Sequence, residues 1–127
     1  LSGTGISDLG DFLFMPFSGE ANVNPGTPED PDAGYRSRFN HDDEVSSPGF
    51  YSVLLKDYNI KAELTATKRA GFHRYTFNKE GNSGIIIDLS HTIYSDDKPN
   101  HQFKLISDTE ISEYKGRAFF SKRIVQN

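Results

Sequence analysis

The 127-residue sequence contains no cysteine and no tryptophan. Without cysteine, the chain can hold neither a disulfide framework nor a thiolate metal site or nucleophile. Its formal net charge is -4 at pH 7, so it has no basic field that would attract nucleic acid or anionic lipid. No apolar run approaches the ~18 residues that a membrane-spanning helix needs. These absences favour a soluble domain that neither binds nucleic acid nor inserts into a membrane.

Hydrophobic residues make up 35% of the chain, which is enough apolar sequence for a core. The length predicts one domain over residues 1–127. The chain begins at Leu1, and its first residues have neither the charged region nor the apolar region of a signal peptide. We therefore expect a processed product or an excised piece whose targeting signal lies upstream.

Several short segments alternate with a period of two residues. Residues 60–67 and 71–78 alternate between two faces, and residues 85–94 are β-branched and mostly apolar. These patterns predict half-buried and central strands. Further strands are predicted at 12–17, 50–57, 102–108 and 116–125. About eight strands at such spacing predict an all-β fold, a sandwich or a barrel. The alternative is a helix across residues 52–70, where Leu54, Leu55 and Tyr58 have helical spacing.

Residues 22–34 contain three of the six prolines and, apart from Val23, no large side chain. This composition predicts a long surface loop rich in proline and glycine.

A charged cluster follows that loop. It consists of Arg36, Arg38, His41, Asp42, Asp43 and Glu44. The cluster lacks the spacing of a calcium-binding loop, and neighbouring carboxylates in an extended segment point to opposite sides. Solvated loop charges are therefore favoured over a metal site. We expect an ion pair between Arg38 and Glu44, and a turn at Pro48–Gly49 before a strand that starts at Phe50.

The residues alone do not identify a catalytic site. No pair stands out among the 18 acidic residues as the two facing carboxylates that a glycosidase needs. No Ser-His-Asp or phosphate-loop pattern is present, because the glycine turn at residues 2–5 lacks the required lysine. The lack of tryptophan counts against a sugar-binding platform. Tyr35, Tyr51 and Tyr94 are candidate platforms, although packing in the core or at an edge is the favoured role for each.

Three stretches resemble the N-terminal β-sandwich region of glycoside hydrolase family 92, the calcium-dependent exo-acting α-mannosidases. They are "LSGTGISDLGDFLFMPFSGE" (1–20), "YRSRFNHDDEVSSPGFYSVLLKDYNIKAELTATKRAGFHRYTF" (35–77) and "GIIIDLSH" (84–91). The resemblance implies an antiparallel β-sandwich, part of a supersandwich of the galactose mutarotase type. It also implies that the charged cluster, with Pro48 and Gly49, is a structural signature of the sandwich.

In the family, the sandwich packs on a larger helical domain, and the active site lies between the two parts. The resemblance implies inverting hydrolysis of mannose-containing glycans, in which one carboxyl protonates the departing oxygen and a second activates water. The catalytic residues and the calcium ligands belong mainly to the helical part. We therefore assign no catalytic or metal-binding residue and no cofactor to this chain, and we expect calcium in the full-length enzyme.

If any segment of the chain touches sugar, the best candidate is Ser2, Gly3, Thr4 and Gly5. Their small side chains would let a ligand or the partner domain approach the backbone closely. A tight turn without a ligand is an equally good interpretation. Two alternatives to the mannosidase role are a free-standing carbohydrate-binding module and a purely structural or interaction sandwich. The family resemblance also implies an exported bacterial protein, periplasmic or at the cell surface.

Overall fold

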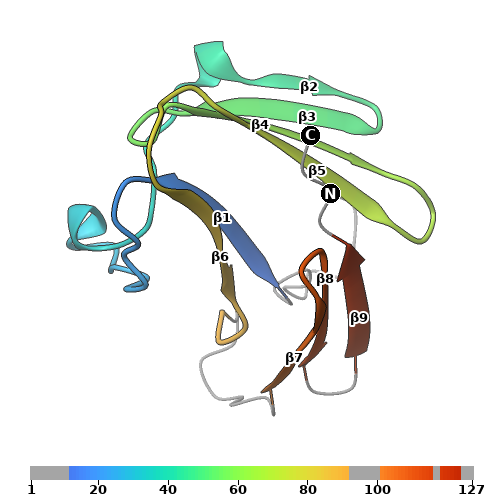
Figure 1. Ribbon diagram of the computed structural model, residues 1–127. Coiled ribbons are helices and arrows are strands. Elements are labelled where there is room, and N and C mark those ends of the chain that lie inside the picture. The colour runs from blue at the N-terminus through green and yellow to red at the C-terminus, as the bar shows by residue number, and fades with distance from the viewer. Residues whose placement is uncertain (1–11, 92–100, 116–117, 124–127) are drawn as a thin grey trace. The chain divides into compact units, whose positions relative to one another are not determined.

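The computed structural model describes residues 12–91, 101–115 and 118–123 (Figure 1). The described residues form nine strands and two short 3-10 helices, η1 (Pro31–Ala33) and η2 (His41–Asp43). The strands are β1 (Leu13–Ser18), β2 (Val45–Ser47), β3 (Phe50–Leu55), β4 (Ile60–Ala66), β5 (Gly71–Phe77), β6 (Ser83–Asp88), β7 (His101–Ser107), β8 (Glu110–Lys115) and β9 (Ala118–Arg123). The predicted all-β, antiparallel sandwich class is confirmed.

The chain divides into two compact units. The first, Phe14–Ile86, contains β2–β5 and most of β1 and β6, and the second consists of residues 1–13 and 87–127. The second unit includes an antiparallel sheet in the order β7-β8-β9, in which Ile111 is buried. The organisation of residues 1–127 as a single domain stays a prediction.

Four strands of the first unit form an antiparallel sheet in the order β2-β3-β4-β5. On one face of this sheet, Val53, Ala62 and Tyr75 lie opposite one another across β3, β4 and β5. Val53 and Ala62 are buried, and Ile60 on the same face is completely buried. We call this the inner face. The alternation predicted for residues 60–67 and 71–78 thus distinguishes the two faces of the sheet.

The turns of this sheet follow from local sequence. Pro48 and Gly49 join β2 to β3, and Gly49 has a φ of 77°, as the second central residue of a type II turn requires. The expected turn before Phe50 is therefore present. Residues 56–59 join β3 to β4, and Asn59 has a φ of 53°, which asparagine tolerates better than most residues. The helix considered for residues 52–70 is wrong, because this turn separates two paired strands.

Strands β1 and β6 pair with each other, and Gly19 N donates a hydrogen bond to Asn82 O at 2.8 Å just beyond their ends. This pair lies against the inner face (Figure 1). There the rings of Phe14 and His73 meet edge-on, with their centroids 5.3 Å apart. Pro16 is completely buried. The core of the first unit therefore lies between the two-stranded and four-stranded sheets.

Residues 22–34 form a surface loop that hydrogen bonds hold together. Tyr35 N donates to Asn24 O at 2.8 Å, and the Asn22 side chain donates to Ala33 O at 3.1 Å. Gly34 and Gly26 approach each other so closely that a Cβ on Gly34 would lie 2.4 Å from Gly26 N. Tyr35, which follows the loop, is buried.

Some predicted strand boundaries are wrong. The strand predicted over residues 85–94 ends at Asp88, because the Asp88 carboxylate accepts hydrogen bonds from Ser90 N at 2.8 Å and His91 N at 3.1 Å. Strands β2 and β8 were not predicted, because β2 has only three residues and β8 is rich in polar residues.

Candidate functional site

The glycine turn at Ser2, Gly3, Thr4 and Gly5 lies outside the described residues, as does Tyr94. The sugar contact considered for that turn stays a prediction. Of the other two tyrosines considered as platforms, Tyr35 is only 4% exposed and has no face to offer a ligand. Tyr51 is half-buried and lines an open pocket.

Arg38 binds Asp57 rather than Glu44. The Arg38 guanidinium contacts Asp57 Oδ1 through Nε at 2.9 Å and Nη2 at 2.7 Å, and its backbone N–H donates to Oδ2 at 2.7 Å. The expected Arg38–Glu44 pair is therefore wrong. The bonds to Arg38 lower the pKa of Asp57. This contact ties the segment after the loop to the β3–β4 turn.

Glu44 instead links His41 to Tyr51. Its carboxylate accepts a hydrogen bond from the Tyr51 hydroxyl and lies 2.5 Å from His41 Nδ1. The bond from Tyr51 is the first cause of the lowered pKa of Glu44, and the bond from His41 is the second. Burial, followed by the contact with Glu44, raises the pKa of Tyr51 to about 12. The hydroxyl of Tyr51 therefore stays protonated, and its position is fixed.

The other charges of the cluster also have separate partners. Arg36 Nε donates to Pro25 O at 3.0 Å, and Asp43 pairs with Lys56 at 3.0 Å. Asp42 is exposed. The carboxylates thus do not converge as the ligands of a Ca²⁺ ion must. Within the described ranges, no group of three or more His, Asp or Glu residues could hold a metal. These residues therefore do not fit calcium.

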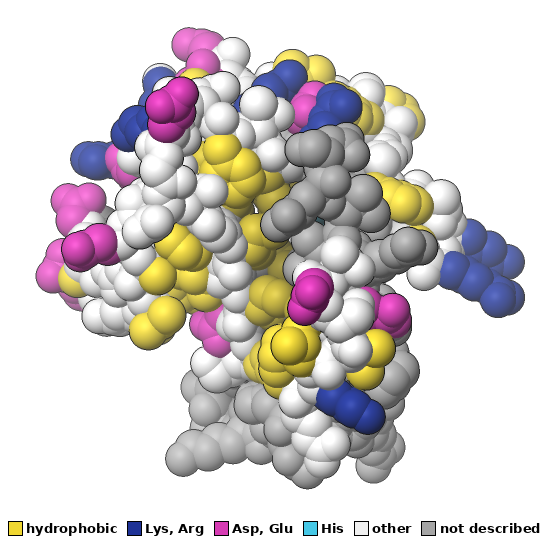
Figure 2. Space-filling model, in the orientation of Figure 1, with side chains coloured by type: hydrophobic (Ala, Val, Ile, Leu, Met, Phe, Trp, Pro, Cys, Tyr) yellow, Lys and Arg dark blue, Asp and Glu magenta, His cyan; other side chains and the backbone are white. Residues whose placement is uncertain are grey.

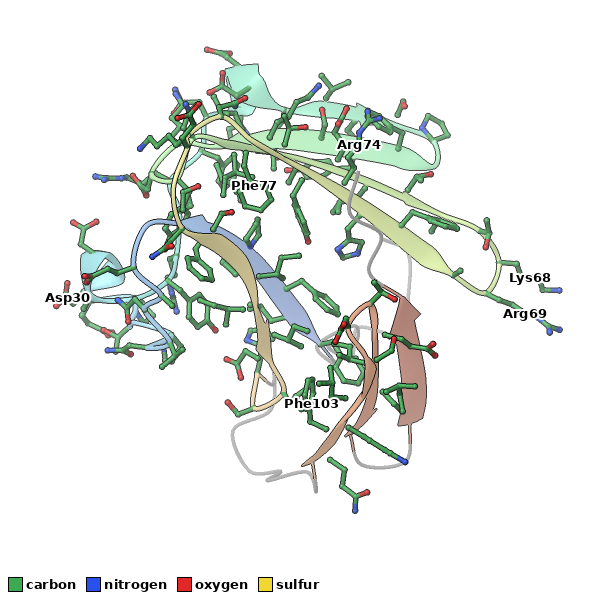
Figure 3. All side chains as sticks on the ribbon, viewed as in Figure 1. Asp30, Lys68, Arg69, Arg74, Phe77 and Phe103 are labelled. Carbon is green, nitrogen blue, oxygen red and sulfur yellow. The ribbon has the colours of Figure 1, made fainter. Side chains whose placement is uncertain are left out.

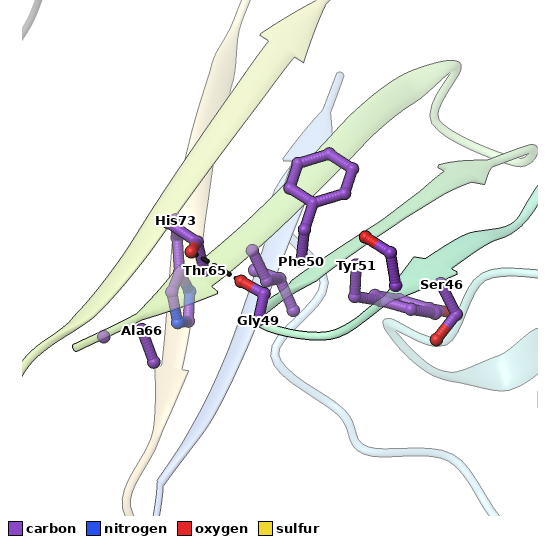
Figure 4. A pocket seen from close by; sticks show the side chains of 10 residues that line it. Ser46, Gly49, Phe50, Tyr51, Thr65, Ala66 and His73 are labelled. Carbon is purple, nitrogen blue, oxygen red and sulfur yellow. Dashed lines mark hydrogen bonds between the residues drawn. The ribbon is translucent and has the colours of Figure 1, made fainter. Parts of the chain in front are cut away.

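The pocket lies at the end of the inner face next to the β2–β3 turn and has a volume of about 450 Å³ (Figure 4). Tyr51, Leu64 and His73 lie opposite one another across β3, β4 and β5 and line it. His73 Nδ1 lies 2.8 Å from the Tyr75 hydroxyl. Thr65 Oγ1 donates to Gly49 O at 2.6 Å, which fixes the turn at the rim (Figure 4).

The opposite face of the four-stranded sheet combines charges with exposed apolar side chains. Glu63 lies between Lys61, at 3.2 Å, and Arg74, at 2.7 Å, and these contacts hold its pKa at about 2. We call this opposite face the outer face. Figure 3 shows Arg74 on the outer face and Phe77 on the inner face. Val45, Phe50 and Phe72 are exposed on it, and Figure 2 shows hydrophobic side chains at the surface over this sheet.

Comparisons with known proteins agree with this antiparallel, all-β architecture. The model of the glycosyl hydrolase family 92 N-terminal domain matches residues 1–125. The chain therefore belongs to that family, and the predicted resemblance is confirmed. No curated protein sequence matches it.

Two solved structures of a GH92 α-mannosidase are also similar to this chain. One is the family GH92 α-mannosidase of Bacteroides thetaiotaomicron, and the other is that enzyme in complex with mannoimidazole. In each comparison the identity is 48% and the TM-score 0.80, over 91% of this chain and 15% of the other chain. The chain thus spans less than a sixth of the length of the α-mannosidase it resembles.

Sequence reasoning missed the pocket itself. It named Tyr51 as one of three possible platforms, but nothing in the sequence pairs Tyr51 with Leu64 and His73. That pairing depends on the register of three strands, which two turns determine. The period-two alternation did predict which residues of β4 and β5 share the inner face.

Proposed function

We propose that this chain is the non-catalytic N-terminal part of an exo-acting, inverting α-mannosidase that cleaves mannose-containing glycans. In this proposal the full-length enzyme depends on calcium, and the sandwich shapes its substrate pocket. The observation that carries the proposal is the 48% identity, over 91% of this chain, to a family GH92 α-mannosidase. The described carboxylates support a non-catalytic role, because Glu44, Asp57 and Glu63 each bind neighbouring side chains of the same unit.

The partner in this proposal is a helical catalytic domain of the same protein. The outer face of β2–β5 supports such docking. Val45 is 56%, Phe50 37% and Phe72 56% exposed, and Phe50 and Phe72 flank Thr65 on that face. Exposed apolar groups gathered on one face are typical of a surface that another domain covers.

Direct carbohydrate binding by this chain is a second candidate function. The observation in its favour is the open pocket at Tyr51, which combines an aromatic ring with hydroxyl groups. A purely structural sandwich would need neither that pocket nor a ligand.

A comparison of two polypeptides tests the mannosidase proposal. The native polypeptide that carries this sequence should be several times longer than 127 residues by intact mass. It should release mannose from an α-mannoside with inverted anomeric configuration, and a calcium chelator should abolish that release. The 127-residue chain should release none. A native product of about this length, or a long one that releases no mannose, would contradict the proposal.

Export to the periplasm or the cell surface of a bacterium is part of the same proposal, since the substrate glycans would lie outside the cell. In the described part of the chain, no helix is long and apolar enough to cross a membrane. Fractionation of the source cells followed by immunoblotting tests this location, and a purely cytoplasmic signal would contradict it.

A further inference from the structure

The pocket at Tyr51 has the lining of a site for a small, neutral ligand. Leu64 and Ala66 supply apolar side chains, and Ser46, which pairs with Tyr51, supplies a hydroxyl group. The volume of about 450 Å³ lies within the range of about 300–1,000 Å³ typical of small-molecule sites. Figure 4 shows that Phe50 points to the opposite side of the sheet from His73. Ser46 pairs with Tyr51 and shares its face, so the ring beside the Ser46 hydroxyl is that of Tyr51.

The chemistry of the lining restricts the ligand to an uncharged one. Among the described residues that line the pocket, there is no Lys, Arg, Asp or Glu. An anion or a cation would therefore gain no lysine, arginine or carboxylate partner there. A polyol would exchange a hydrogen bond to water for one to the Ser46 hydroxyl at little net cost.

Contacts outside the pocket hold Tyr51 in place. Its hydroxyl donates to Glu44, and Glu44 is also bound by His41. On β4 the backbone of Leu64 pairs with Tyr51 on one side and with His73 on the other. A ring fixed in this way loses little side-chain entropy when a ligand stacks on it, which improves binding to an open site. Glu44 and His41 are therefore positioning residues for this platform.

We infer that this pocket binds a neutral pyranose, one sugar unit of the glycan, at a site formed by this chain alone. A pyranose has C–H bonds on one face and hydroxyls around its rim. The C–H face would pack on Tyr51 and Leu64, and rim hydroxyls would bond to Ser46, which shares the inner face with Tyr51. The inference rests on the proposed function for the choice of mannose-containing glycan, and it adds a binding site whose described lining belongs to this chain.

Gly71 offers a way to block the pocket without removing any side chain. It lines the pocket opposite Ala66. A Cβ on Gly71 would have only His73 Nε2 within 4 Å, at 4.0 Å. Gly71→Leu should therefore fill the pocket and leave the strand intact. Ala66→Leu is a second blocking variant, because Ala66 is exposed on the same face. Thr76→Leu is the matched control, because Thr76 is exposed on the outer face of the same strand.

The experiment is an NMR titration of the 127-residue chain with methyl α-D-mannopyranoside. We expect weak, saturable shifts centred on Tyr51, Leu64 and Gly71. Gly71→Leu and Ala66→Leu should weaken binding by at least about tenfold, with unchanged melting temperatures, and Thr76→Leu should bind as the wild type does. Glucuronate, an anionic sugar, should bind more weakly than the mannoside.

The inference would be overturned if no saturable shifts appeared, or if both blocked variants bound as tightly as the wild type. Equal binding of glucuronate would overturn the choice of a neutral ligand. Each of these results would leave the proposed mannosidase role intact, because mannose release by the full-length polypeptide tests that role separately. Conversely, saturable binding by the chain alone would support the site even if the long polypeptide released no mannose.

Discussion

At the scale of single residues, Asp57 is the centre of the contact that joins the charged cluster to the sheet. Its side chain is 28% exposed, whereas that of Arg38 is 75% exposed. Asp57→Ala removes the acceptor of both the guanidinium and the backbone N–H of Arg38. We expect it to lower the free energy of unfolding by about 1 kcal/mol. Arg38→Ala should cost less, because alanine keeps the backbone bond to Asp57. Urea denaturation measures both.

Asp42→Ala is the control for this pair, since it removes an exposed carboxylate from the same cluster. Its free energy of unfolding should match that of the wild type. A larger loss of stability in Arg38→Ala than in Asp57→Ala would show that the guanidinium, and not the carboxylate, carries the contact.

At the scale of elements, the loop over residues 22–34 depends on the close approach of two glycines. A Cβ on Gly34 would lie 2.4 Å from Gly26 N and 2.6 Å from Gly26 Cα. Both are backbone atoms, so the loop itself would have to shift. We expect Gly34→Ala to destabilise the protein by about 1–3 kcal/mol, measured by thermal unfolding. Gly71→Ala is the control, because its Cβ would have only the end of the His73 side chain within 4 Å, at 4.0 Å. Equal melting temperatures for the two variants would contradict this account.

The same scale shows what the sequence could predict. Alternation predicted β4 and β5 and which residues of each strand share a face, because side chains on a strand alternate strictly. It could not predict the partner of Arg38, since that contact brings together residues 19 positions apart through the geometry of a turn. Strand β6 ends early because the Asp88 side chain binds the backbone of Ser90, a local competition that apolar periodicity does not register.

At the scale of the whole molecule, the exposed apolar outer face should make the isolated 127-residue chain bind apolar dyes and self-associate. Val45, Phe50 and Phe72 are the residues to change. Replacing all three by threonine, which suits strands, should lower the binding of an apolar dye and any self-association in light scattering. Val23→Thr is the control, because Val23 is exposed on the loop and lies away from that face. If the triple variant bound as much dye as the wild type, the outer face would not be the docking surface.

The strand order also has a consequence for how the chain folds. Among the described strands, β2 to β5 pair only with neighbours in sequence, across short turns, so the four-stranded meander can assemble with little loop-closure entropy. Strand β1 must instead find β6, about 65 residues later. Proteins rich in local contacts fold faster than those that depend on distant ones. During synthesis, β1 therefore stays without its partner strand until β6, the last strand of the first unit, has emerged.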